Sequence, residues 1–254
     1  MIFTAVRKKP KLYMWHMAAG RGKVQVLEKM RDWTKEIRLN PEELRKVVCL
    51  LKENSGQRLL HNVAGSGKVE LLEELWDWAK KLQLISEKLR KKVFVKTQFW
   101  TNALAQCTRS GNVEVLRKLW DWAKELQLNP EELRDDVLLS KDESGQTTWH
   151  IAASIGYVEL LEKMWDYANK LQVKPEELRN ESLLSKDKSG KTIWLKATKS
   201  GTVKLLEKLW DWTNELQLNP EELRTEVLLS RDKYGNTAWH NAASRGYFEL
   251  LGRM

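Results

Sequence analysis

Cysteine, proline and long apolar runs are all scarce in this sequence. With two cysteines in 254 residues, the chain lacks the disulfide framework of small secreted proteins, and we expect Cys49 and Cys107 to be reduced, half-buried thiols. No apolar run approaches the roughly 20 residues that a helix needs to span a bilayer. The basic residues at 7–9 follow the first apolar stretch, which is the reverse of a signal peptide. We therefore expect a cytoplasmic protein without a membrane span.

Charge is plentiful but uneven along the chain. The net charge is +9, and residues 1–110 contain 23 Lys and Arg against 11 Asp and Glu, whereas residues 111–254 contain 21 against 24. A basic segment attracts an acidic partner, an anionic membrane or a nucleic acid. A solvated surface of helix-forming lysines has the same composition, and we favour this second interpretation.

An internal repeat of 45 residues organises the sequence. The segment 142–185 matches residues 187–230 after a shift of 45, and a second shift matches it from residue 232 onward. A period of this size is typical of stacked repeats, in which each unit contacts only its neighbours. We therefore predict one repeat array over residues 1–254, with repeats at about 12–55, 56–99, 100–144, 145–189 and 190–234 and a partial repeat at 235–254.

Each repeat is predicted to form three helices. In the fourth repeat the first helix covers about residues 147–154 and ends at Gly156, because glycine readily takes the left-handed conformation of a helix stop. The second covers about residues 158–171, where apolar residues recur at helical spacing, and another such helix is expected to begin at Tyr247. Third helices begin with a capping asparagine and a proline, as at Asn129 and Pro130, and one covers about residues 130–138. The fold class is therefore all-α.

The first helix and its turn carry the motif of a known repeat family. The chain reads Asp-x-x-Gly-x-Thr-x-Trp-His-x-Ala-Ala-x-x-Gly over residues 142–156 and again over residues 232–246. This motif resembles the ankyrin repeat, although each repeat is about 12 residues longer than the roughly 33 usual in that family. The additional residues form the Pro-Glu-Glu-Leu-Arg helix, where ankyrin repeats place a β-hairpin tip. The resemblance implies an ankyrin-like helical solenoid that binds a protein through its concave face.

No motif indicates an enzyme, a cofactor or a metal ion. The sequence contains no phosphate-binding loop, no nucleophile with a plausible base and no carboxylate pair outside the helix starts. The four histidines share one position of the repeat, and we expect each imidazole to be structural, bonded to a turn threonine such as Thr147 or Thr237, instead of binding zinc. The Trp-Asp-Trp motif of the second helix is expected to serve core packing. Because the aromatic residues do not alternate with basic ones, we expect no nucleic-acid partner.

The ankyrin resemblance implies a partner surface on the turn tips and on the outer side of the first helices. These positions differ from repeat to repeat while the apolar positions stay the same, as on a surface adapted to one partner. The chain itself is expected to be monomeric. The residues predicted to contact a protein partner are Arg21, Asn62, Arg109, Glu143, Ser154, Ile155, Lys188, Lys196, Lys199, Lys233, Tyr234, Asn241 and Arg245.

Two alternatives to a protein-binding scaffold stay open at this point. The repeats could form a structural spacer or membrane-skeleton element that sets a distance between other components. They could also be an adaptor fragment of a larger channel or ubiquitin-ligase-type protein. We favour the non-catalytic scaffold because the side chains that vary between repeats fall on one predicted surface.

Overall fold

The structure is a computed structural model that describes residues 17–23, 25–26, 28–29, 32, 59–81 and 99–247. These residues form helices and turns without a strand, and an isolated bridge between Lys141 and Thr147 is the one β-type pairing among them. For these residues the predicted all-α class is confirmed, while the solenoid with three helices per repeat stays a prediction. Cys49 and the helix expected from Tyr247 onward lie outside the described part, apart from Tyr247 itself.

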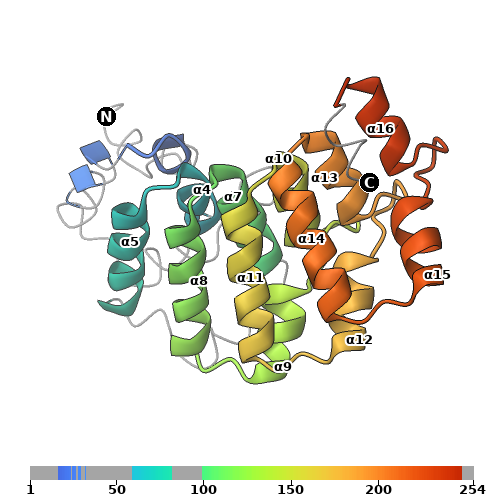
Figure 1. Ribbon diagram of the computed structural model, residues 1–254. Helices are drawn as coiled ribbons and strands as arrows, with labels where there is room; N and C mark the ends of the chain where they lie inside the picture. Colours follow the sequence, from blue (N-terminus) through green and yellow to red (C-terminus); the bar gives the residue numbers. More distant parts are fainter. Residues whose placement is uncertain are drawn as a thin grey trace. The chain divides into compact units, whose positions relative to one another are not determined.

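The chain forms two compact units, residues 1–128 and residues 129–254. The described residues of the N-terminal unit include two pairs of successive helices. The first helices of the pairs, α4 (Leu59–Ser66) and α7 (Phe99–Ser110), pack against each other, and so do the second helices, α5 (Val69–Lys81) and α8 (Val113–Glu125). Each helix of one pair thus lies beside the equivalent helix of the next pair (Figure 1).

The C-terminal unit repeats this arrangement. The short helix α13 (Ile193–Ser200) packs against both α10 (Thr148–Ile155) and α16 (Ala238–Ser244). The longer helices α11 (Val158–Lys170) and α14 (Val203–Glu215) also pack against each other (Figure 1). The bounds predicted for the first two helices of the fourth repeat agree with α10 and α11 to within one residue.

The segment predicted as one short α-helix over residues 130–138 has a different form in the structure, and so do its two described equivalents in the C-terminal unit. A single α-turn comes first, and the chain then widens into a π-helical turn. Leu139, for example, donates its backbone N–H to the carbonyl oxygen of Arg134, five residues earlier, at 2.8 Å. These paired elements are α9 (Pro130–Glu132) and η3 (Leu133–Leu138), α12 (Pro175–Leu178) and η4 (Arg179–Leu183), and α15 (Pro220–Glu222) and η5 (Leu223–Leu228).

Burial explains the π-helical turn. A π-turn takes up more residues than an α-turn, so residues four and five positions apart both return to the side that faces the core. In η3 these are Leu133, Val137 and Leu138, and all three are buried. The start is fixed by Asn129, whose side chain accepts a hydrogen bond from the backbone of Glu132 (2.8 Å), while the Glu132 carboxylate accepts one from the backbone of Asn129 (3.0 Å).

Tryptophan rings join the longer helices of successive repeats. In the N-terminal unit Trp76 of α5 stacks on Trp122 of α8, with ring centroids 4.2 Å apart and planes 8° apart. In the C-terminal unit Trp165 of α11 stacks on Trp212 of α14 in the same way, at 4.6 Å and 8°. Trp149 of α10 meets both of the latter rings edge-on. In both units, the first aromatic residue of one Trp-Asp-Trp or Trp-Asp-Tyr motif therefore packs on the last tryptophan of the motif 45 or so residues later.

Trp210 departs from this pattern. It occupies the register of Trp76 and Trp165, yet it is 41% exposed, whereas Trp212 is 5% exposed. Its described ring contact is an edge-on approach to Trp194 at 6.4 Å. The two tryptophans of α14 thus provide a buried and a half-exposed example of the same residue type, two positions apart.

We predict that Trp212→Ala destabilises the C-terminal unit far more than Trp210→Ala. Replacing a buried tryptophan costs about 3–5 kcal/mol because the removed ring leaves a cavity and its stacking partner loses contact. The half-exposed ring has less buried area to lose. Urea unfolding followed by circular dichroism measures both variants, and equal midpoints would contradict the assignment of Trp212 to the interface between α11 and α14.

Candidate partner-binding groove

The turns before the first helices are built identically in the C-terminal unit. In each, an aspartate accepts two backbone N–H bonds through Oδ1; Asp187 accepts them from Ser189 (2.8 Å) and Lys191 (3.0 Å). Neighbouring turns are then joined by their backbones. The N–H of Lys188 donates to the carbonyl of Ser144, and the N–H of Lys233 donates to that of Ser189, both at 2.9 Å. The turn tips are therefore held in register with one another.

A buried histidine links one repeat to the next. Nε2 of His150 lies 3.0 Å from the carbonyl oxygen of Ser185, and Nδ1 lies 2.9 Å from the hydroxyl oxygen of Thr147. Because a carbonyl can only accept, the neutral ring carries its proton on Nε2 and donates it to Ser185. Burial lowers the pKa of His150 below its ordinary value. The expected bond to Thr147 is confirmed, and Thr237 contacts His240 in the same way.

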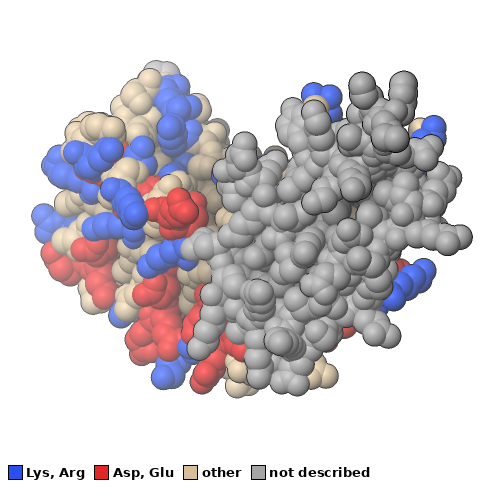
Figure 2. Space-filling view, turned by 180° about the vertical axis from the view of Figure 1, so that it is seen from behind, with Lys and Arg blue, Asp and Glu red and all other residues tan. Residues whose placement is uncertain are grey.

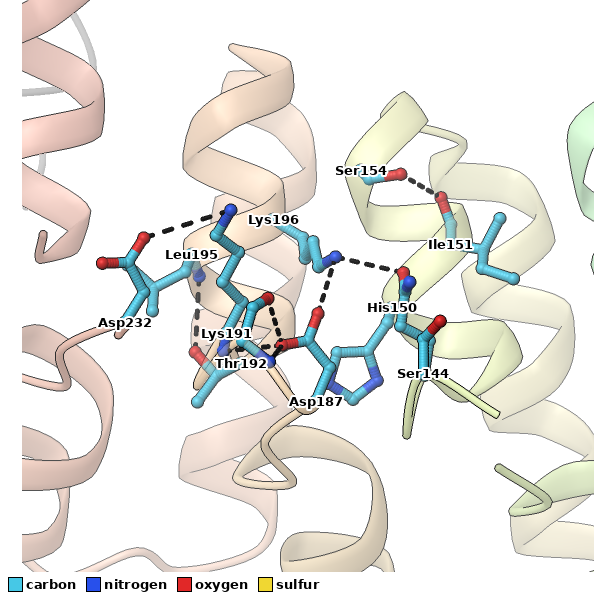
Figure 3. Close-up of polar contacts among 12 residues, drawn as sticks. Ser144, His150, Ile151, Ser154, Asp187, Lys191, Thr192, Leu195, Lys196 and Asp232 are labelled. Carbon is cyan, nitrogen blue, oxygen red and sulfur yellow. Dashed lines mark hydrogen bonds and ion pairs between the residues drawn. The ribbon is translucent and has the colours of Figure 1, made fainter. Parts of the chain in front are cut away.

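Lys196 forms a second link between repeats, close to this histidine (Figure 3). Its ammonium lies 2.9 Å from the carboxylate of Asp187 and donates to the side-chain oxygen of Gln146 at 3.0 Å. Burial alone would raise the pKa of Asp187, but hydrogen bonds from Ser189, from Lys196 and from the backbone of Lys191 hold it at about 2. The carboxylate therefore stays charged at neutral pH, and Lys196 is committed to it.

Beside this network the short helices α10, α13 and α16 border an open groove. Its volume is about 470 Å³, which is within the range of about 300–1,000 Å³ typical of ligand sites. Two serines and four cationic residues line it, together with the apolar side chain of Ile155, which is 40% exposed. We call this feature the basic groove; its lining residues are Ser154, Ile155, Lys191, Lys196, Lys199, Ser200 and Arg245.

Two of the four cations in the basic groove have carboxylate partners. Lys196 pairs with Asp187, and Lys191 lies 4.0 Å from the carboxylate of Asp232 (Figure 3). Lys199 and Arg245 are exposed, and within the described residues neither forms an ion pair. Since no acidic residue lines the groove, it carries a local excess of positive charge. Figure 2 shows that Lys and Arg cluster on one part of the C-terminal unit, with Asp and Glu gathered elsewhere on the same face.

The predicted partner-binding residues divide into three groups in the structure. One group lines the basic groove: Ser154, Ile155, Lys196, Lys199 and Arg245. Asn241, half-buried on α16, is not among the lining residues. A second group lies exposed on the turn tips: Glu143, Lys188, Lys233 and Tyr234. The third belongs to the N-terminal unit: Arg21, Asn62 and Arg109. Their contact with a partner remains a prediction, and Lys196 serves an internal ion pair that the sequence-based prediction did not include.

Two lining residues were not predicted from the sequence. Ser200 occupies the position of Ile155 and Arg245, 45 residues from each, so the repeat register itself could have identified it. Lys191 comes from the turn before α13 and reaches the groove by extending beside Asp232. Its position depends on how neighbouring turns pack, and no pattern in the sequence indicates it.

The described residues contain neither a candidate metal centre nor a membrane-spanning helix. No group of three or more His, Cys, Asp or Glu side chains there could hold a metal ion, and no helix there is long and apolar enough to cross a membrane. A scan against protein-family models and a search of curated proteins found no match to this chain.

We predict that the stability of the C-terminal unit falls as the pH drops below about 6.5, and that His150 causes part of this loss. Because the pKa of His150 is lowered in the folded protein, the unfolded chain takes up the proton first and is stabilised relative to the native state. Stability is fully present above the unfolded pKa and is lost on acidification. Asp187 contributes a separate loss, between 3.8 and about 2.

Urea unfolding of the wild type and of His150→Gln between pH 7.5 and 5.0 tests this assignment. The variant should be less stable at pH 7.5 by about 1–3 kcal/mol, since it loses buried hydrogen bonds. It should also depend less on pH across this range, so the two curves converge on acidification. Parallel curves would show that His150 does not titrate with unfolding.

Proposed function

We propose that the protein is a non-catalytic, ankyrin-like scaffold that binds another protein on the face formed by its first helices. In this proposal each repeat adds three helices to a solenoid, and the repeats are those predicted from the sequence. The recurrence of the same tryptophan stack in both units supports this architecture, since Trp76 and Trp122 repeat the geometry of Trp165 and Trp212. Stacked repeats of this kind create extended binding surfaces.

The observation that carries the binding proposal is the composition of the basic groove. Six of its seven lining residues occupy only three positions of the repeat. These positions lie five, two and one residues before the glycine that follows the first helix of each copy, which is Gly156, Gly201 or Gly246. The side chains at these positions differ between copies, while the helices beneath them are packed alike. A uniform frame with a variable, concave surface is what recognition requires and what a spacer does not need.

A non-catalytic role is supported by the state of the described cysteine. Cys107 is a free thiol at 0% exposure, so the prediction of a half-buried thiol is wrong for this residue. Burial raises its pKa well above the ordinary value. A protonated, buried thiol is not a nucleophile. A free thiol also suits a reducing compartment, so we propose a cytoplasmic location. A monomeric state is a separate part of the proposal.

Affinity capture with matched charge variants tests the binding role. The first variant, Lys199→Glu with Arg245→Glu, reverses the two cations of the basic groove that have no carboxylate partner. The control, Lys174→Glu with Lys204→Glu, makes the same change in net charge at exposed positions outside the groove. Both control positions lie at helix N-termini, where glutamate is favourable, so this variant should fold normally.

We predict that proteins captured by the wild type are also captured by the control and are lost from the groove variant, with both variants melting as the wild type does. Quantitative mass spectrometry of the captured proteins measures this loss, and a tenfold or larger decrease is expected for a partner held at the groove. Equal capture by all three chains would place binding elsewhere. The absence of any specific partner would favour the structural spacer.

A further inference from the structure

We infer that the basic groove binds a short acidic segment of the partner, in extended conformation, with an aliphatic residue beside its carboxylates. This inference rests on the proposed scaffold function and adds the chemistry of the ligand. Lys199 and Arg245 would pair with two carboxylates of the segment, and Ile155 would contact its aliphatic side chain. Lys191 and Lys196 would shape the groove while remaining paired with the chain's own aspartates.

The charge of the groove selects an anionic ligand. Of the four cations that line it, Lys191 and Lys196 already face Asp232 and Asp187. Lys199 and Arg245 have no such partner among the described residues, and no acidic side chain lines the groove to compete with a ligand. The excess of two positive charges is local, because residues 111–254 contain more acidic than basic residues. An acidic ligand would therefore be drawn to the groove instead of to the surrounding surface.

The arrangement of the short helices favours an extended peptide. Ile155, Lys199 and Arg245 sit at the C-terminal ends of α10, α13 and α16 respectively, which pack side by side in that order. Packed helices are about 8–10 Å apart, and an extended chain advances about 3.3 Å per residue. A peptide that crosses the three helix ends thus advances roughly three residues per helix. Its two carboxylates would lie two to three residues apart, and its aliphatic residue would lie on the α10 side.

The same observations argue for a peptide and against a nucleic acid. Proteins that bind single strands combine a long basic track with aromatic rings on which bases stack, and no aromatic side chain lines the groove. Two available cations would neutralise about two phosphates, far fewer than the 6–10 contacts of a typical nucleic-acid site. The exposed aliphatic surface of Ile155 has no role in phosphate binding. It does suit a side chain next to carboxylates.

Selection from a random library of displayed nine-residue peptides tests the inference with the full chain. The wild type and the Lys174→Glu, Lys204→Glu control should both enrich peptides that carry two or more Asp or Glu beside an aliphatic residue. The Lys199→Glu, Arg245→Glu variant should lose these peptides and instead enrich Lys and Arg, because its groove has the opposite charge. A preference that stays acidic in this variant, or no enrichment with the wild type, would overturn the inference.

Fluorescence anisotropy with a selected peptide then separates the contributions. Replacing its acidic residues by Gln or Asn, or using the groove variant, should weaken binding about tenfold or more at low salt, and added salt should weaken the wild-type complex. Ile155→Ser should weaken binding only of peptides that keep the aliphatic residue. Tighter binding of a labelled oligothymidylate than of the peptide would contradict the inference in favour of nucleic acid.

Failure of this inference is distinguishable from failure of the proposed function. If captured cellular proteins depend on Lys199 and Arg245 but no acidic peptide is selected, the binding face is correct and the ligand chemistry assigned here is wrong. If acidic peptides are selected but no cellular partner depends on these residues, the groove has the assigned chemistry, and the proposed binding of a cellular protein at this face is wrong.

Discussion

Stacking of indole rings between successive repeats is the interaction on which the rest of the C-terminal unit depends. A single repeat exposes a broad apolar face on its long helix, and it cannot bury that face alone. The rings of Trp165 and Trp212 stack face to face and so cover each other, and Trp149 of the short helix α10 packs edge-on against both. Large aromatic rings bury much area and tolerate few arrangements, so the contact also determines how one repeat is oriented on the next.

Polar contacts then align the layer of short helices and turns. Two buried polar groups form these contacts. The imidazole of His150 donates a hydrogen bond to the carbonyl of Ser185. The carboxylate of Asp187 accepts hydrogen bonds from backbone N–H groups and pairs with the ammonium of Lys196. Breaking either contact would leave a buried polar group without a partner, which costs more than the contact itself contributes. These contacts also fix part of the wall of the basic groove, because Lys196 both pairs with Asp187 and lines the groove.

Much of this organisation could be predicted from the sequence because the repeat constrains it. The bounds of the first two helices, the buried apolar positions of α11 and the bond between Thr147 and His150 all follow from period and spacing. The π-helical turns could not be predicted, because a stretch such as 133–138 has an ordinary helical composition and only its burial against α11 requires the wider turn. For the groove, the repeat register indicated Ile155, Lys199 and Arg245. It did not indicate that Lys196 would form an ion pair with Asp187.

The half-exposed ring of Trp210 has a consequence for extending the protein by further repeats. It offers, on the outer side of α14, the kind of flat indole surface that Trp165 offers to Trp212. Under the proposed architecture, an engineered copy of the 45-residue unit joined after the last residue would bring an aromatic ring into position to cover it. Length would then be a free parameter for a protein engineer, and copies with different side chains at three surface positions could be combined into a binding face of chosen composition.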